Sequence, residues 1–180
     1  MWILSMETFY EIQFAQGKDE IFVEQLAEYD DQALSIGQFI PETPFAVKVS
    51  KGKKLYDIMR YQDPFNFAVS ERVYKLLKDA NLTGWNSYEI TIEGRNENYY
   101  GFQVLGKCGP LKRPPEPGFV TGCEFDYETW DGSDFFCPEE TLLIFCTEKA
   151  KKLLYTNQVT NIELADISTW NGTVLKKIAV

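Results

Sequence analysis

The 180-residue sequence contains no histidine. This absence excludes Ser-His-Asp and Cys-His nucleophile activation, every histidine-containing metal site, and the most common general base at neutral pH. Catalysis by carboxylates, lysine, tyrosine or a Ser-Lys pair stays open. Since few of the usual catalytic combinations remain, we expect no catalytic residues, no cofactor and no bound metal.

Basic residues are also scarce. The 18 Lys+Arg residues stand against 27 Asp+Glu residues, which gives a net charge of −9 and a pI near 4.6. Such a chain repels phosphate groups, so nucleic acid and anionic membranes are poor partners and a basic protein is a better one. An acidity that serves only solubility is the simpler alternative.

Long hydrophobic runs are absent as well. No apolar stretch approaches the roughly 18 residues of a transmembrane helix. The first residues, Met1–Glu7, include no basic segment, and their apolar run is too short for a signal peptide. We therefore expect a cytoplasmic protein that does not associate with a membrane.

Cysteines are few and widely spaced. They lie at positions 108, 123, 137 and 146, and none forms a Cys-x-x-Cys pair. The spacing typical of zinc sites is therefore missing. An even number of cysteines permits disulfides, but a reducing compartment favours four free thiols.

Aromatic residues, in contrast, are plentiful. The sequence has 13 Phe and 10 Tyr, and 44% of its residues are hydrophobic. This supplies ample apolar area for a core, and the length fits one domain spanning residues 1–180.

Hydrophobic periodicity predicts most of the secondary structure. Period-two alternation predicts strands at residues 10–14, 45–49, 88–92 and 100–104. The acidic stretch 18–31 predicts a short helix with Phe22, Leu26 and Tyr29 on one side. Half of the 8 prolines lie between Gly106 and Gly118. Because proline cannot donate to a strand ladder, we expect this segment to be a loop.

An internal repeat is the main structural feature of the sequence. Residues 67–85 align without gaps on residues 144–162, with five identities in 19 positions, where about one is expected by chance. Each copy has a strand, a Ser or Thr cap (Ser70 or Thr147), a helix and a second strand. The sequence therefore predicts an α+β fold with a mixed or mainly antiparallel sheet and two duplicated strand–helix–strand units. Alternatively, any strand–cap–helix–strand unit would give such a match.

The segment 124–134 has the highest density of acidic residues, with five in 11 positions. On a strand, Glu124, Asp126 and Glu128 would share one face, where like charges need solvent or an incoming cation. Asp131-Gly132 is typical of a turn. The candidate partner-binding residues are Glu124, Asp126, Glu128, Trp130, Asp131 and Asp134.

Three interpretations of this acidic segment stay open. It could be a solvated strand face, a docking surface for a basic partner, or a site for a cation or a glycosidase-like carboxylate pair. An EF-hand is excluded because the ligand spacing and the terminal glutamate are missing.

Four segments together resemble a known family. They are residues 67–72 (FAVSER), 99–110 (YYGFQVLGKCGP), 130–136 (WDGSDFF) and 159–164 (VTNIEL). Their order and spacing resemble the eleventh immunity-protein family of bacterial polymorphic toxin systems, which was first catalogued as a domain of unknown function. The resemblance covers roughly residues 45–170.

This resemblance implies a non-enzymatic bacterial antidote, which binds and blocks a cognate toxin made by the same or a neighbouring cell. It supplies no catalytic residues to transfer. The expected partner is therefore a cognate protein toxin, with a basic one favoured by charge. A carboxylate-based hydrolase that uses the acidic strand 124–134 is the alternative.

Overall fold

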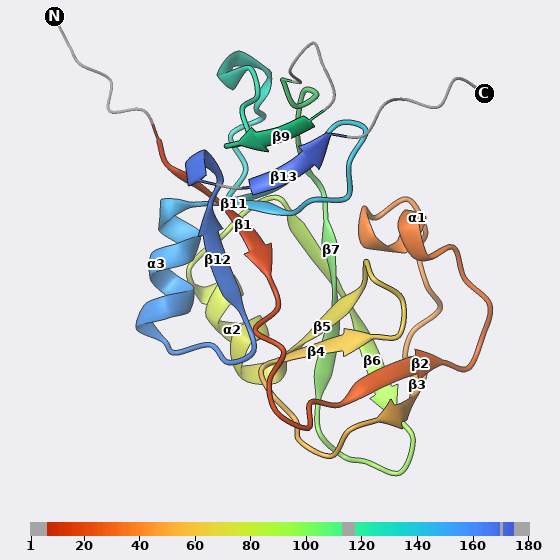
Figure 1. Cartoon of the computed structure of the whole chain (residues 1–180). Coiled ribbons are helices and arrows are strands. Elements are labelled where there is room, and N and C mark those ends of the chain that lie inside the picture. Colours follow the sequence, from red (N-terminus) through yellow and green to blue (C-terminus); the bar gives the residue numbers. More distant parts are fainter. Residues whose placement is uncertain (1–6, 113–117, 170, 175–180) are drawn as a thin grey trace, which may run out of the picture.

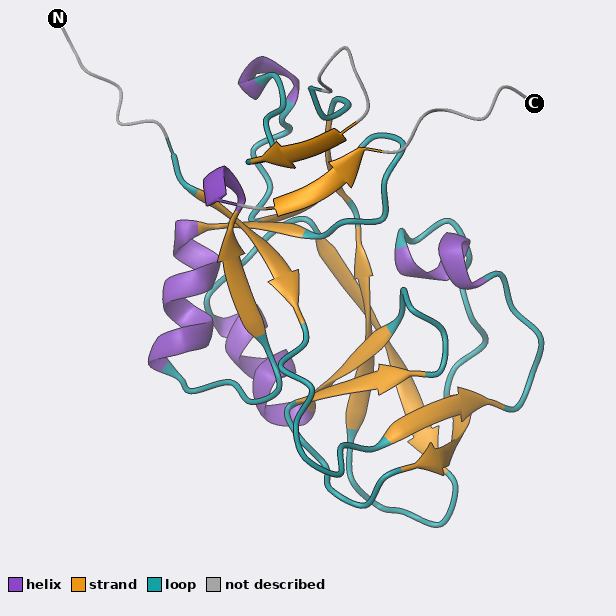
Figure 2. Cartoon of the chain, in the orientation of Figure 1, coloured by secondary structure: helices purple, strands orange, loops and turns teal. Residues whose placement is uncertain are grey.

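A computed structural model describes residues 7–112, 118–169 and 171–174. This part of the chain is mostly strand, with three α-helices and two short 3-10 helices (Figure 2). In chain order the elements are β1 (Phe9–Gln13), β2 (Phe22–Gln25), α1 (Asp31–Ser35), β3 (Phe45–Lys51), β4 (Ile58–Tyr61), β5 (Phe67–Ser70), α2 (Glu71–Asp79), β6 (Trp85–Ile92), β7 (Tyr99–Val104), β8 (Gly106–Cys108), β9 (Gly118–Thr121), η1 (Tyr127–Thr129), β10 (Phe135–Pro138), β11 (Phe145–Thr147), α3 (Glu148–Thr156), β12 (Glu163–Asp166), η2 (Ile167–Thr169) and β13 (Asn171–Val174).

Six strands from the first 104 residues form a closed barrel in the order β2-β3-β6-β7-β5-β4. The pairs β3–β6 and β2–β4 are parallel and the other pairs are antiparallel. Apolar side chains such as Val23, Val47 and Ala68 pack in one buried cluster with Leu34 of α1. The amide of Gln103 in β7 donates to the carbonyl oxygens of Leu34 and Phe39 at 2.9 and 3.0 Å, which fixes α1 against the barrel.

A five-stranded sheet adjoins the barrel in the order β12-β1-β11-β10-β8. Strand β1, from the beginning of the chain, lies between β11 and β12 from its end (Figure 1). Only β10 and β8 pair in parallel. A separate two-stranded sheet pairs β13 with β9. The sheets are therefore mixed, as predicted, and the fold class α+β is confirmed.

Helices α2 and α3 lie side by side on one flank of the molecule (Figure 1). Both predicted caps are confirmed, since the hydroxyl oxygen of Ser70 accepts from Val73 N and that of Thr147 accepts from Ala150 N. The inner faces of the helices bury Leu77 of α2 and the corresponding leucine of α3, Leu154. These side chains join one core cluster with aromatic residues of β7 and β10, so a single core connects barrel and sheet.

Two sequence predictions were wrong. The acidic stretch 18–31 forms β2 rather than a helix, because Ile21 and Val23 alternate into the barrel core, and the helix begins only after Asp30, which caps it. Residues 106–108 form β8 rather than a loop, because they pair with β10. Gly106 permits this pairing, since a Cβ there would lie 2.1 Å from the carbonyl oxygen of Phe135. Pro114, Pro115 and Pro117 lie outside the described residues.

Within the described ranges, each helix is too short or too polar to cross a membrane.

Candidate functional site

The acidic segment 124–128 does not form the strand that its alternation predicts. Asp126 caps the 3-10 helix η1, because its carboxylate accepts from Glu128 N at 3.2 Å. Aspartate often replaces strand pairing by such local bonds. Glu124, Asp126 and Glu128 are nevertheless all exposed, so their charges meet solvent from a loop and a helical turn.

Aromatic residues form the base beneath these carboxylates. Phe125 is buried, and its ring lies 5.3 Å from Phe9 and 5.6 Å from Phe136 between centroids. Trp130 packs edge-on against Phe9 at 5.0 Å and donates its indole N–H to the carbonyl oxygen of Ser133. Trp130 is thus half-buried and mainly supports the loop.

Tyr127 is the aromatic residue that stays open to solvent. Its side chain is 53% exposed, although its ring contacts those of Phe9 and Trp130. An exposed tyrosine among carboxylates can contact apolar groups and cations alike. Tyr127 is therefore a contact residue that the strand prediction had placed beside Phe125.

A hollow of about 460 Å³ opens beside this loop. Its lining residues come from the start of β1, the segment 121–127 and the junction of β12 with η2, and they are Glu7, Thr8, Phe9, Lys112, Thr121, Gly122, Cys123, Glu124, Phe125, Tyr127, Asp166, Ile167 and Ser168. Three carboxylates face one ammonium group there, and the ammonium of Lys112 lies 3.9 Å from Glu124. We call this hollow, together with Asp126 and Glu128, the acidic–aromatic surface.

Asp131 has a structural role at the edge of the sheet. Its carboxylate accepts from Lys107 N at 2.8 Å and from Ser133 N at 3.0 Å. Its own N–H donates to the carbonyl oxygen of Lys107 at 3.1 Å. Asp131 thereby covers the outer edge of β8, and Gly132 supplies the positive φ of 84° that the turn requires.

Asp134 is buried and therefore differs most from its predicted role as a partner-binding residue. Its carboxylate accepts from the backbone N–H and hydroxyl of Thr83, from the hydroxyl of Thr147 and from the ammonium of Lys149, at 2.9 to 3.2 Å. These four donors occupy the carboxylate, so Asp134 joins α3 to the segment that follows α2.

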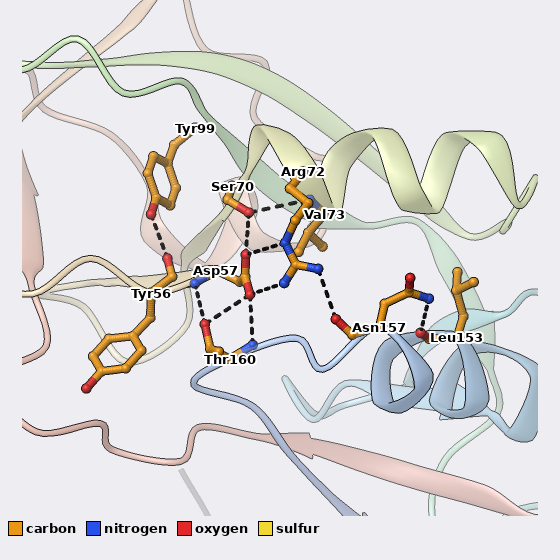
Figure 3. Close-up of polar contacts among 9 residues, drawn as sticks. All are labelled: Tyr56, Asp57, Ser70, Arg72, Val73, Tyr99, Leu153, Asn157 and Thr160. Carbon is orange, nitrogen blue, oxygen red and sulfur yellow. Dashed lines mark hydrogen bonds and ion pairs between the residues drawn. The ribbon is translucent and has the colours of Figure 1, made fainter.

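Asp57, which sequence reasoning missed, occupies an equivalent position before β4 (Figure 3). It accepts from the hydroxyl of Ser70 at 2.8 Å, from the backbone N–H and hydroxyl of Thr160 at 2.9 and 3.0 Å, and from the guanidinium of Arg72. Burial alone would raise the pKa of Asp57, but the hydrogen bonds from Arg72 and Thr160 outweigh burial and hold the pKa below its usual value.

The two carboxylate networks correspond position by position at an offset of 77 residues. The matched pairs are Asp57 and Asp134, Ser70 and Thr147, Arg72 and Lys149, and Thr83 and Thr160. The offset is the one found in the sequence alignment, and extending that alignment back by ten positions would have paired the two aspartates.

The other acidic segment, 19–31, is largely committed to the barrel. Glu20 is buried, 3.3 Å from the guanidinium of Arg60, and it accepts from the amide of Asn161 at 2.6 Å. Glu24 pairs with Lys48 across β2 and β3 at 3.0 Å. This segment therefore offers fewer free carboxylates than its composition suggests.

The thiols are unpaired and their environment makes them poorly reactive. Burial raises the pKa of Cys108 and of Cys146 to about 12 in each case. Within residues 7–112, 118–169 and 171–174, no group of three or more Cys, Asp or Glu side chains is arranged to hold a metal ion.

No protein-family model matches this chain, and no curated protein matches it significantly.

Proposed function

We propose that this chain is a non-enzymatic binding protein that captures a basic protein partner through its acidic–aromatic surface. The observation that carries the proposal is the open hollow beside η1, where Glu7, Glu124 and Asp166 surround aromatic side chains. Carboxylates at the rim attract a cationic partner, and a desolvated aromatic centre supplies affinity.

The resemblance described above makes this partner a cognate bacterial toxin and makes the chain its immunity protein. In that role the protein acts in the bacterial cytoplasm, where the toxin would otherwise act. The net charge of −9 supports this role, because long-range attraction speeds the capture of a basic toxin. Rapid capture matters for an antidote, which must act before the toxin does.

Co-expression tests this function. The chain is produced together with the toxin domain of a neighbouring gene, and growth and co-purification are measured. We expect rescued growth and a stable complex whose association slows as salt concentration rises. A neighbour-encoded partner that neither binds nor becomes harmless would refute the immunity role.

We also propose that residues 57–85 and 134–162 are copies of one ancestral unit. In support, β10 and α3 have the bounds of β4 and α2 shifted by 77 residues, and the strand pairs Ile58↔Val69 and Phe135↔Cys146 show the same shift. A chimera that carries the α2 sequence in place of α3 should fold, whereas a scrambled helix of equal composition should not.

A further inference from the structure

Helices α2 and α3 run antiparallel, so each helix begins beside the end of the other. At one junction, Arg72 at the start of α2 donates to the carbonyl oxygen of Asn157, the C-cap of α3, at 2.9 Å (Figure 3). At the other junction, Lys149 at the start of α3 lines a groove together with Ala80, the C-cap of α2.

The two junctions differ because position 149 holds lysine where position 72 holds arginine. The guanidinium of Arg72 has separate nitrogens, which reach Asp57 and the carbonyl of Asn157 at once. The ammonium of Lys149 is a single donor centre, and it pairs with Asp134 at 3.2 Å. The first junction is therefore bridged, whereas the second remains open.

The open junction forms a groove of about 630 Å³. Its lining residues are Ala80, Leu82, Glu148, Lys149, Lys152, Leu153, Thr156 and Asn157. The apolar part is made by Ala80, Leu82 and Leu153. Two ammonium groups flank it, since the side chains of Lys149 and Lys152 are 58% and 73% exposed. Glu148 is paired with Lys151 and Lys152 at 3.4 and 3.7 Å.

The charge of this face is opposite to that of the whole chain. Helices α2 and α3 contain six of the 18 Lys+Arg residues and only three of the 27 Asp+Glu residues. A negatively charged segment is repelled by most of a chain of net charge −9, but these helices attract it. Charge complementarity therefore selects an acidic occupant for the groove.

We propose that the groove between α2 and α3 binds a short acidic segment of a partner protein that carries an aliphatic side chain. The aliphatic group packs on Leu82 and Leu153, and flanking carboxylates pair with Lys149 and Lys152. This groove shares no lining residue with the hollow of the acidic–aromatic surface, and the proposal does not depend on the function proposed for that surface.

A fluorescein-labelled peptide of alternating aspartate and leucine serves as the probe, and its anisotropy is measured at low ionic strength. We expect the wild-type protein to bind it, and to bind weakly or not at all when serine replaces leucine or lysine replaces aspartate. Failure to bind the aspartate–leucine peptide, or equal binding of the serine version, overturns the proposal.

Matched variants test whether the groove is the binding site. Lys152→Gln should weaken binding roughly three- to five-fold, the effect of one exposed ion pair. Lys75→Gln is the control, because Lys75 is similarly exposed, pairs with Glu71 at 2.8 Å and lies outside the groove. Equal effects of the two variants would mean that the peptide follows general charge, and would overturn the assignment.

Lys149→Arg provides a third test that leaves the net charge unchanged. The longer forked side chain should reach across to the end of α2, as Arg72 does at the other junction, and so occupy the groove. We expect lower peptide affinity with unchanged thermal denaturation. Undiminished affinity would refute the explanation that the lysine at position 149 keeps the groove open.

Discussion

Thr83 follows α2 in the chain, yet its backbone N–H and its hydroxyl both donate to Asp134, 51 residues later, at 2.9 and 3.2 Å. Thr160, which follows α3, donates in the same way to Asp57, 103 residues earlier. Each helical unit therefore supplies hydrogen bonds to the aspartate of the other. Loss of either aspartate should loosen both units rather than one.

The stability supplied by Asp57 should depend on pH. Because its pKa is lowered in the folded protein, this stability is present above the unfolded value of about 3.9 and is lost as pH falls through the folded value. Asp57→Asn should therefore cost about 2 kcal/mol at neutral pH, with a shrinking difference from wild type in acid. Urea denaturation over a pH series measures this difference.

Glu163→Gln is the control for that series, because Glu163 is an exposed carboxylate on β12. Its difference from wild type should stay near zero at every pH. A constant difference between Asp57→Asn and wild type would show that the charge of Asp57 contributes nothing to stability.

The helix caps should contribute more than ordinary caps. The hydroxyl of Ser70 accepts from Val73 N and also donates to Asp57, and the hydroxyl of Thr147 serves Ala150 N and Asp134 in the same way. An ordinary cap contributes about 1 kcal/mol, and a second hydrogen bond adds about as much. Ser70→Ala and Thr147→Ala should each lower the free energy of unfolding by about 2 kcal/mol in denaturant titrations.

Thr156→Ala is the matched control for the caps, since Thr156 is exposed at the end of α3. Its change should stay within about 0.5 kcal/mol. If the cap variants were no less stable than this control, the two hydroxyls would have no structural role.

Charge reversal on the acidic–aromatic surface should slow association with the toxin. We choose Glu124→Lys combined with Glu128→Lys and leave Asp126 intact, because Asp126 caps η1. Association at low salt should fall roughly ten-fold and lose salt dependence, while dissociation changes little. Stopped-flow fluorescence measures both rates.

A second double variant, Glu42→Lys with Glu89→Lys, changes the net charge equally at exposed positions of the barrel region. It should slow association much less. If both double variants slow it to the same extent, only the net charge matters and the binding surface lies elsewhere.

The cysteines should react only after unfolding. With the pKa of Cys108 and Cys146 raised to about 12, few thiolates exist near pH 8. Ellman's reagent should therefore label the native protein slowly and reveal four thiols in denaturant without reductant. Two thiols instead of four would indicate a disulfide or an oxidised pair.

Local patterns predicted those parts of the fold that depend on neighbouring residues. The strands β3, β6 and β7 and the capped helices α2 and α3 follow from periodicity and from a hydroxyl before the first turn. The segment 18–31 misled the analysis, because four-residue β2 obtains its stability from the barrel rather than from its own pattern.

The candidate site was predictable only in part. The exposure of Glu124 follows from its charge, but the burial of Asp134 depends on Thr83 and Lys149, which are distant in sequence. A carboxylate surrounded by such donors looks like any surface acid in a sequence. Likewise, closure of the barrel through the parallel pair β2–β4 leaves no local signal.

The position of β1 has a consequence for protein synthesis. This strand pairs only with β11 and β12 among the described residues, so its partners leave the ribosome more than a hundred residues later. The strands of the barrel, by contrast, all lie within residues 22–104 and can associate while the remainder is still being translated. The nascent chain must therefore keep its first strand unpaired until nearly the whole polypeptide has emerged, and that interval is when chaperones would protect it.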